Sequence, residues 1–192
     1  MGNRNPMQLK LTDFPARPVG AYYAPWSDRY ADYFIEPKAN GWRGWFNQKT
    51  KQGYNRHGKI ASNENLMREL LSNCKIKSPW IDCEIMGMRE KHGRNTIIII
   101  DAFDPDNPKP YEERIKEFEH IQPASFNLQD NSLLRMPRLA HSKLKLIWND
   151  MNFYNKHGGI IWEGFVMKKD KFYPALKNPN YASSQWHKWR MI

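Results

Sequence analysis

The sequence predicts one α+β domain whose sheets are antiparallel or mixed. Strand-like segments are interleaved with amphipathic helical segments, and several strands are close enough along the chain to form hairpins. The length of 192 residues fits a single domain, and an apolar content of 40% is enough for a core. Residues 1–30, rich in proline, arginine and tyrosine, are expected to be an irregular lead-in to a domain that covers residues 31–192.

The first strands of the domain are expected on either side of a break at Gly41. Residues 33–35 predict a short strand that leads into Glu36 and Lys38, and residues 42–46 predict the next strand. The polar segment that follows, KTKQGYNRHGK, is expected to turn the chain back as a hairpin.

The middle of the chain predicts a helix and two further strands. Ser62 is expected to be the N-cap of a helix that runs to about Asn73. In the next strand apolar and acidic residues alternate, so Asp82 and Glu84 share one face, opposite the core. The continuous β-branched run at residues 96–100 predicts a buried central strand.

Two more helices and two more strands complete the predicted fold. Pro110 begins a short helix that turns Ile115 and Phe118 inward. Residues 142–156 predict a longer helix that ends at the glycine pair 158–159. Its buried stripe is expected to consist of Leu146, Ile147, Met151 and Tyr154. Residues 160–167 and the last ten residues are expected to be strands.

Charge and cysteine content narrow the class of protein. Thirty Lys and Arg against twenty Asp and Glu give a net charge of +10, which favours an anionic partner, and eight tryptophans favour nucleic acid over a membrane. Two cysteines are too few for a disulfide framework or a zinc site. A cytoplasmic location is therefore expected, or the host cell for a viral protein, or the nucleus for a eukaryotic one. The longest aliphatic run, residues 97–100, is too short to cross a membrane.

Residues 38–43, KANGWR, are the most informative segment. The spacing K-x-x-G-x-R places Lys38 beside a tight turn, with Arg43 as a second cation. An ordinary lysine has a pKa of about 10.4, so nucleophilic attack requires burial or nearby cations that lower this pKa. The pattern predicts a lysine nucleophile directed at phosphorus, and a solvated turn lysine is the competing interpretation.

Two downstream segments carry groups that suit a phosphate and a sugar. Arg56 lies in the turn NRHG, and an arginine on a glycine-containing turn suits a phosphate clamp. Glu84, in the strand segment DCE, is suited to accept hydrogen bonds from a ribose hydroxyl. Taken singly, a solvated turn and the polar face of a strand also explain these two residues.

The C-terminal part of the chain supplies a carboxylate and three more cations. Glu163 begins the segment EGFVMK, and Mg²⁺ is commonly held by one or two carboxylates together with phosphate oxygens. Lys168 lies on the same strand, and Lys188 and Arg190 share one face of the segment WHKWR, so all three suit phosphates. A surface charge pair and a basic aromatic tail on nucleic acid are the competing interpretations.

Together and in this order, the segments resemble the motifs of the covalent nucleotidyltransferase superfamily, which comprises ATP-dependent DNA ligases, RNA ligases and mRNA capping enzymes. KANGWR resembles the lysine motif, NRHG the Arg-Gly turn, DCEIMG the Asp-x-Glu strand, EGFVMK the Glu-Gly strand and WHKWR the closing motif. The matches run from Glu36 to Arg190, nearly the whole chain. The closing motif is more similar to that of DNA ligases, so an ATP-dependent DNA ligase is expected first.

The resemblance implies an ATP-grasp-like fold in which two antiparallel or mixed sheets flank a nucleotide groove. It implies that Lys38 accepts AMP from ATP with Mg²⁺ or Mn²⁺, that the AMP passes to a 5′-phosphate, and that a 3′-hydroxyl then displaces it. The implied partners are ATP and nicked duplex DNA or RNA. The implied roles are nucleotide binding by Glu36, Arg43, Glu84, Ile100, Lys168, Lys188 and Arg190, contact with a nucleic-acid phosphate by Arg56, and metal binding by Glu163 and Glu84.

The chain departs from the family pattern at four places. Arg190 stands where a second lysine is commoner, a change that keeps the charge. Asn40 stands where DNA ligases usually carry aspartate. Ile100 stands where an aromatic ring normally stacks on the base, and Phe103 is the alternative alignment. Family ligases continue into an OB-fold domain after the closing motif, whereas this sequence stops at Ile192. An OB-fold domain is therefore expected to be absent or to come from a separate protein.

Three other activities share these residues. An RNA ligase would use all of them. A capping-type guanylyltransferase would attach GMP instead of AMP to Lys38. A catalytically degenerate domain would bind nucleic-acid ends through its net charge of +10 alone.

Overall fold

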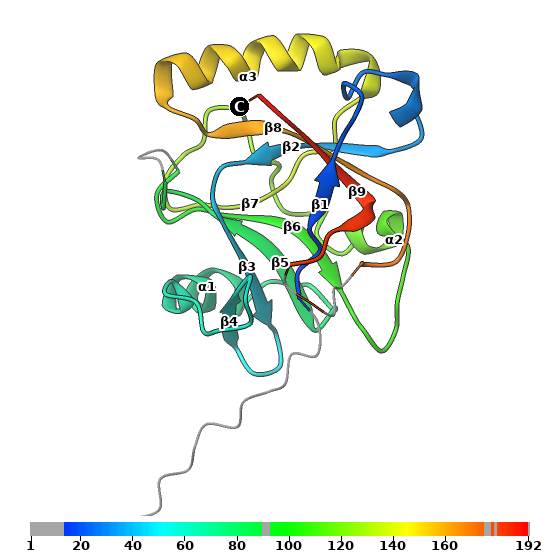
Figure 1. Cartoon of the computed structure of the whole chain (residues 1–192). Helices are drawn as coiled ribbons and strands as arrows, with labels where there is room; N and C mark the ends of the chain where they lie inside the picture. The colour runs from blue at the N-terminus through cyan, green and yellow to red at the C-terminus, as the bar shows by residue number, and fades with distance from the viewer. Residues whose placement is uncertain (1–13, 90–92, 175–177, 179, 192) are drawn as a thin grey trace, which may run out of the picture.

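The computed structural model describes residues 14–89, 93–174, 178 and 180–191, so residues 1–13 of the lead-in lie outside it. The described chain is α+β, with two mixed sheets and three α-helices (Figure 1). The strands are β1 (Pro18–Gly20), β2 (Phe34–Ala39), β3 (Trp42–Asn47), β4 (Gln52–Asn55), β5 (Trp80–Ile85), β6 (Ile97–Phe103), β7 (Leu133–Arg135), β8 (Trp162–Lys168) and β9 (Ser183–Arg190). The helices are α1 (Glu64–Leu71), α2 (Tyr111–Ile115) and α3 (Leu144–Gly158), with 3-10 turns η1 (Asp28–Tyr30) and η2 (His141–Lys143).

The four-stranded sheet has the strand order β1-β9-β8-β2. Strand β1 runs parallel to β9, so part of the lead-in that was expected to be irregular belongs to this sheet. Lys38 on β2 lies opposite Gly164 on β8, and Gly164 lies opposite Arg190 on β9. A Cβ atom at Gly164 would lie 2.0 Å from the carbonyl oxygen of Trp189, and the φ of Gly164 is +142°, so this position requires glycine. The register therefore brings three strands together beside Lys38.

The five-stranded sheet has the strand order β4-β3-β5-β6-β7. Its pairs are antiparallel except for β6 and β7, which run parallel. Arg43 on β3 lies opposite Glu84 on β5. A Cβ atom at Gly41 would lie 2.6 Å from the carbonyl oxygen of Ile85, so the absence of a side chain lets the turn before β3 pack directly on the end of β5.

The two larger hydrophobic clusters among the described residues stabilise the sheets. One packs α1 and α2 against one face of the five-stranded sheet and includes Phe46, Met67, Leu71, Ile99 and Ile115. The other joins α3 and the four-stranded sheet to the opposite face of β6 and includes Ile98, Ile100, Met151, Trp162 and Phe165. In Figure 1, α3 lies along β8 and β2, whereas α1 lies beside β3 and β4 at the opposite end of the molecule. Strand β6 is buried along its whole length because it is covered on both faces, which confirms the predicted central strand.

The beginning of α1 differs from the prediction. The helix begins at Glu64 with Asn63 at the N-cap, so the expected cap at Ser62 was wrong. The Ser62 hydroxyl instead donates a hydrogen bond to Oδ1 of Asn63 at 3.0 Å. The helix also ends at Leu71, before the predicted Asn73.

The predicted buried face of α3 was right for Met151 and for the partly buried Ile147, but wrong for Leu146 and Tyr154. Met151 is buried as expected, but Leu146 is 63% exposed and Tyr154 is exposed as well. The fully buried Leu144 lies seven residues before Met151, so these two residues share one face at the helical period. None of the helices among the described residues is both long enough and apolar enough to cross a membrane.

Asp82 on β5 is fully buried, although the face that it shares with Glu84 was expected to point away from the core. The alternation of β5 was read correctly, but a second layer covers this face. Tyr173, from the connection between β8 and β9, donates a hydrogen bond to Oδ2 of Asp82. The face is therefore an interface between layers, which the strand pattern alone does not reveal.

Candidate active site

A groove of about 550 Å³ lies between residues of the two sheets and the segment that leads into β1. Seven of its lining residues carry positive charge, namely Arg17, Lys38, Arg43, Arg56, Arg89, Lys188 and Arg190. Two carry negative charge, Glu84 and Glu163. This excess of cations suits an anionic ligand, because a groove lined by one sign of charge concentrates the field inside it.

Lys38 lies at the end of β2, where the register with β8 shifts. Its side chain is 19% exposed, and Nζ lies 2.6 Å from Oε2 of Glu163. A buried or half-buried lysine near other cations is the type of lysine that serves as a nucleophile. In this structure the ammonium group of Lys38 is held by an ion pair with the carboxylate beside it.

Glu163, the carboxylate of β8, lies beside three cations. Besides Lys38, Nε of Arg190 lies 3.2 Å from Oε2, and Nη1 of Arg89 lies 3.2 Å from Oε1. The Glu163 side chain is 7% exposed. One carboxylate does not neutralise three cations, so positive charge remains available for a ligand around it.

Arg43 extends into the groove from β3, and its guanidinium is held by Asp82, which lies outside the groove lining. Its Nε donates to Oδ1 of Asp82 at 2.6 Å, and its Nη2 also pairs with that carboxylate. Burial alone would lower the pKa of Arg43, but the Asp82 carboxylate outweighs it and raises this pKa above its ordinary value. The guanidinium is therefore charged and fixed in direction.

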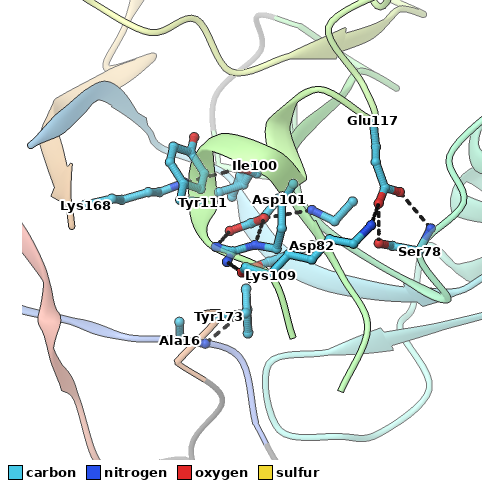
Figure 2. A network of polar contacts seen from close by, with 12 residues as sticks. Ala16, Ser78, Asp82, Ile100, Asp101, Lys109, Tyr111, Glu117, Lys168 and Tyr173 are labelled. Carbon is cyan, nitrogen blue, oxygen red and sulfur yellow. Dashed lines mark hydrogen bonds and ion pairs between the residues drawn. The ribbon is translucent and has the colours of Figure 1, made fainter. Parts of the chain in front are cut away.

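Tyr173 also contacts the Asp82 carboxylate, and Figure 2 shows its hydroxyl directed at Ala16. Its hydroxyl donates to Asp82 and accepts hydrogen bonds from Nε1 of Trp45 and from the backbone N–H of Ala16, both at 3.2 Å. Burial, together with the nearby Asp82 charge, raises the pKa of Tyr173, so the phenol keeps its proton. Ala16 and Arg43 both line the groove. The Tyr173 hydroxyl therefore connects these two parts of the lining, Ala16 directly and Arg43 through Asp82.

Glu84 and Lys188 line the groove with shifted pKa values. Oε1 of Glu84 accepts a hydrogen bond from the backbone N–H of Gly41 at 3.1 Å. Burial raises the pKa of Glu84, and the charges of Lys38 and Arg43 oppose this rise. Burial lowers the pKa of Lys188, and the neighbouring charges of Arg190 and Lys38 lower it further.

Arg56 lies in the exposed turn after β4 and lines the same groove. Its Nε contacts Nε2 of the neighbouring His57 at 3.0 Å. Seven of the ten residues singled out in the sequence thus lie along one groove, namely Lys38, Arg43, Arg56, Glu84, Glu163, Lys188 and Arg190. Their individual roles remain predictions.

Two of the remaining three residues, Glu36 and Lys168, form a buried ion pair outside the groove lining. Nζ of Lys168 lies 2.7 Å from Oε2 of Glu36, and the Lys168 side chain is completely buried. Tyr111 donates a hydrogen bond to the same carboxylate, and the rings of Tyr111 and Trp186 lie 4.6 and 4.4 Å from the ammonium nitrogen. The rings cover the pair, so the structure does not bring these charges to the groove.

Ile100, the predicted base-contacting residue, also lies outside the groove lining. Its side chain belongs to the buried cluster around α3, and its carbonyl oxygen accepts a hydrogen bond from Lys168 at 3.2 Å (Figure 2). The alternative residue, Phe103, stacks on Tyr173 with ring centroids 3.9 Å apart. Both side chains already have protein partners in this structure.

The sequence reasoning assigned no role to Arg89, Trp42 or Tyr173. Trp42 lines the groove and is partly exposed, and it was visible within KANGWR. Arg89 follows the Asp-x-Glu segment in the connection between β5 and β6. Nothing in the sequence marks Tyr173, because its partner Asp82 is 91 residues away along the chain.

The carboxylates of the groove are of the kind that suits Mg²⁺ better than a softer metal. Glu84 and Glu163 are the carboxylates of its lining. Magnesium needs one or two carboxylates because it keeps several waters and takes further oxygens from phosphates. Among the residues that the structure describes, no group of three or more His, Cys, Asp or Glu is placed to hold a metal ion by itself.

Known proteins resemble this chain in structure but do not match it in sequence. No family model matches the chain, and no curated protein matches it in sequence. A solved structure from work on Lig E DNA ligases, described as binding DNA with a minimal scaffold, matches with a TM-score of 0.57 and 14% identity, over 92% of this chain and 68% of that one.

Two further structures agree with this result. The Chlorella virus DNA ligase-adenylate matches with a TM-score of 0.59 and 15% identity, over 93% of this chain and 67% of that one. A structure named Pmar-Lig_Pre matches with the same score and identity, over 93% of this chain and 46% of that one. The mixed two-sheet architecture described above is therefore a DNA-ligase-like fold.

Proposed function

We propose that this protein is an ATP-dependent polynucleotide ligase, most specifically a DNA ligase, that works through a lysyl-AMP intermediate on Lys38. The observation that carries the proposal is the pairing of Lys38 with Glu163 inside a groove lined by further cations. A volume of about 550 Å³ is within the usual range for a site that binds a small molecule of nucleotide size. The DNA-ligase-like fold supports the same class of enzyme.

In the first step Nζ of Lys38 attacks the α-phosphorus of ATP. A nitrogen–phosphorus bond forms, the bond from the α-phosphorus to the bridging oxygen breaks, and pyrophosphate leaves with the electron pair. Lys38 must lose a proton, and Oε2 of Glu163 is an acceptor at 2.6 Å. Lys188 and Arg190 line the same groove and would stabilise the negative charge that develops on the phosphates.

In the second and third steps the AMP is transferred and then released. A terminal 5′-phosphate oxygen attacks the AMP phosphorus, and the bond to Lys38 breaks. A 3′-hydroxyl then attacks the activated 5′-phosphorus, forms the phosphodiester and releases AMP. Arg56, on the exposed turn at the groove, is suited to hold a backbone phosphate during these steps.

Glu163 and Glu84 would hold a magnesium or manganese ion in this groove. When bound, the ion supplies charge neutralisation for the phosphate oxygens. The protein residues position the reactants, because phosphoryl transfer depends mainly on orientation and on electrostatic stabilisation.

The test is covalent labelling of the protein with α-labelled ATP and Mg²⁺, in the presence and absence of an added OB-fold partner. We expect a label on the wild type that is absent from Lys38→Ala and unchanged in Lys145→Ala, an exposed lysine on α3. A wild type that takes no label from ATP or GTP would sink the proposal. A label that persists in Lys38→Ala would show that another residue is the nucleophile.

The remaining activities are separated by substrate. Labelling by GTP in preference to ATP would identify a guanylyltransferase. Sealing of matched nicked duplexes with DNA or RNA on the 3′ side separates a DNA ligase from an RNA ligase. Binding of nucleic-acid ends without any label would identify the degenerate domain.

A further inference from the structure

We infer that Arg89 forms a subsite for the outer phosphates of the nucleoside triphosphate, the part that leaves as pyrophosphate. The inference rests on the proposed function for its place in a reaction. It also stands on geometry that the sequence motifs do not include. Arg89 lies in the connection between β5 and β6, outside every motif that predicted the site.

Arg89 spans the groove between the two sheets. Its Nη1 donates to Oδ1 of Asn40, in the turn after β2, at 2.9 Å, and to Oε1 of Glu163 on β8 at 3.2 Å. Within the described part of the chain, both of these polar contacts use Nη1 alone. A guanidinium has five N–H donors, so the remaining donors of this 47% exposed side chain are available to a ligand.

The two oxygens of Glu163 divide the cations around it. Oε2 contacts Lys38 and Arg190, whereas Oε1 contacts Arg89. Lys38 bonds to the α-phosphorus in the proposed reaction, so the Oε2 side faces the reacting phosphate. Arg89 lies on the other oxygen of the carboxylate, where the next phosphates of a triphosphate would be within reach.

Asn40 and Glu163, the two partners of Arg89, leave its guanidinium suited to bind a phosphate. Asn40 is neutral, so Glu163 supplies the only negative charge among these two partners. If Glu163 held a metal ion, Arg89 would lose that charge. An anionic phosphate oxygen replaces it well, because arginine forms strong paired hydrogen bonds with phosphate.

The direct test is binding of inorganic pyrophosphate with Mg²⁺, measured by calorimetry and independent of any catalysis. We expect Arg89→Ala to weaken this binding by about 10- to 100-fold, the range for hydrogen bonds to charged groups. Arg89→Lys is expected to recover part of the loss. Arg94→Ala, which removes an exposed arginine from the same connection outside the groove lining, is expected to bind pyrophosphate like the wild type.

Two half-reactions test whether Arg89 binds a phosphate of ATP or a phosphate of the nucleic acid. Arg89→Ala should need about 10-fold more ATP or greater to form lysyl-AMP, yet seal a nick that is already adenylated at the wild-type rate. An equal loss in both half-reactions would assign Arg89 to a nucleic-acid phosphate and overturn the inference.

The pyrophosphate-binding measurement tests the subsite separately from the proposed ligase activity. Wild-type binding of pyrophosphate that does not depend on Arg89, or no binding at millimolar concentrations, would overturn it. Arg89-dependent binding in a protein that forms no lysyl-AMP would support the subsite and sink the proposed ligase activity. A matched unfolding temperature for Arg89→Ala and Arg94→Ala is expected, because both side chains lie at the surface.

Discussion

Nζ of Lys38 lies 2.6 Å from Oε2 of Glu163, so the candidate nucleophile and the candidate metal ligand hold each other. Glu163→Gln keeps the shape but removes the charge. We expect formation of lysyl-AMP to slow by about 100-fold or more, because the variant loses the carboxylate that would hold the metal ion and accept the proton of Lys38. The measurement is single-turnover labelling over a range of Mg²⁺ concentrations. Glu113→Gln, an exposed glutamate on α2, is the matched control, and an unchanged rate and Mg²⁺ dependence in Glu163→Gln would contradict the metal assignment.

Tyr173→Phe tests whether one phenol supports the walls of the groove. The variant removes the donor to Asp82 and the acceptor for Trp45 and Ala16, and leaves three buried or half-buried polar groups without this partner. We expect the free energy of unfolding to fall by about 1–3 kcal/mol. Urea denaturation measures this change. The exposed Tyr181→Phe is the control, and equal stability of the two variants would show that the hydroxyl contributes nothing.

Lys168→Met tests the buried ion pair with Glu36. The substitution leaves an unpaired carboxylate in a buried site, which typically costs about 3–5 kcal/mol of stability. The double variant Glu36→Gln/Lys168→Met should regain most of the loss, because no buried charge remains. Chemical denaturation of the two single variants and the double variant gives the coupling. A purely additive result would mean that the pair does not interact.

The same variant predicts a specific pH dependence. Burial raises the pKa of Glu36, and the Lys168 charge opposes this rise, so the pKa rises further in Lys168→Met. The folded state then binds the proton more tightly than the unfolded chain does, and its stability falls as pH rises through the interval between the two pKa values. We therefore expect the stability deficit of Lys168→Met, relative to wild type, to shrink as the pH is lowered from neutral. A deficit that grows on acidification would contradict this assignment.

Lys188 gives a second pH prediction, for ligand binding. Burial and the charges of Arg190 and Lys38 lower its pKa, so it loses its charge at a lower pH than an ordinary lysine. Lys188→Arg stays charged throughout this range. We expect the ratio of pyrophosphate affinities, variant to wild type, to rise as the pH is raised from neutral into the alkaline range. Lys145→Arg serves as the control, and a ratio for Lys188→Arg that stays flat would show that Lys188 does not contact the anion.

The sequence predicted the elements well where local periodicity decides the structure. The strand around residues 42–46 and the buried run at residues 96–100 were confirmed. The incorrect predictions concern α3 and β5, where packing against other elements decides which side chains are buried. The apolar residues of α3 fit two neighbouring stripes, and packing on the four-stranded sheet selected the one with Leu144 and Met151. Asp82 appeared to be solvated because strand alternation carries no information about a second layer.

The sequence by itself determined which charged groups exist and their order along the chain. Only the tertiary structure decided which of them share a groove. The register at Gly164 places Glu163 between Lys38 and Arg190, whereas Lys168, five residues on, lies under two aromatic rings with Glu36. The contacts of Lys38 with Glu163 and of Glu36 with Lys168 depend on pairing between β2 and β8, which are more than 100 residues apart in sequence. A pattern read along one strand cannot supply them, because the neighbours of a side chain come mostly from other strands.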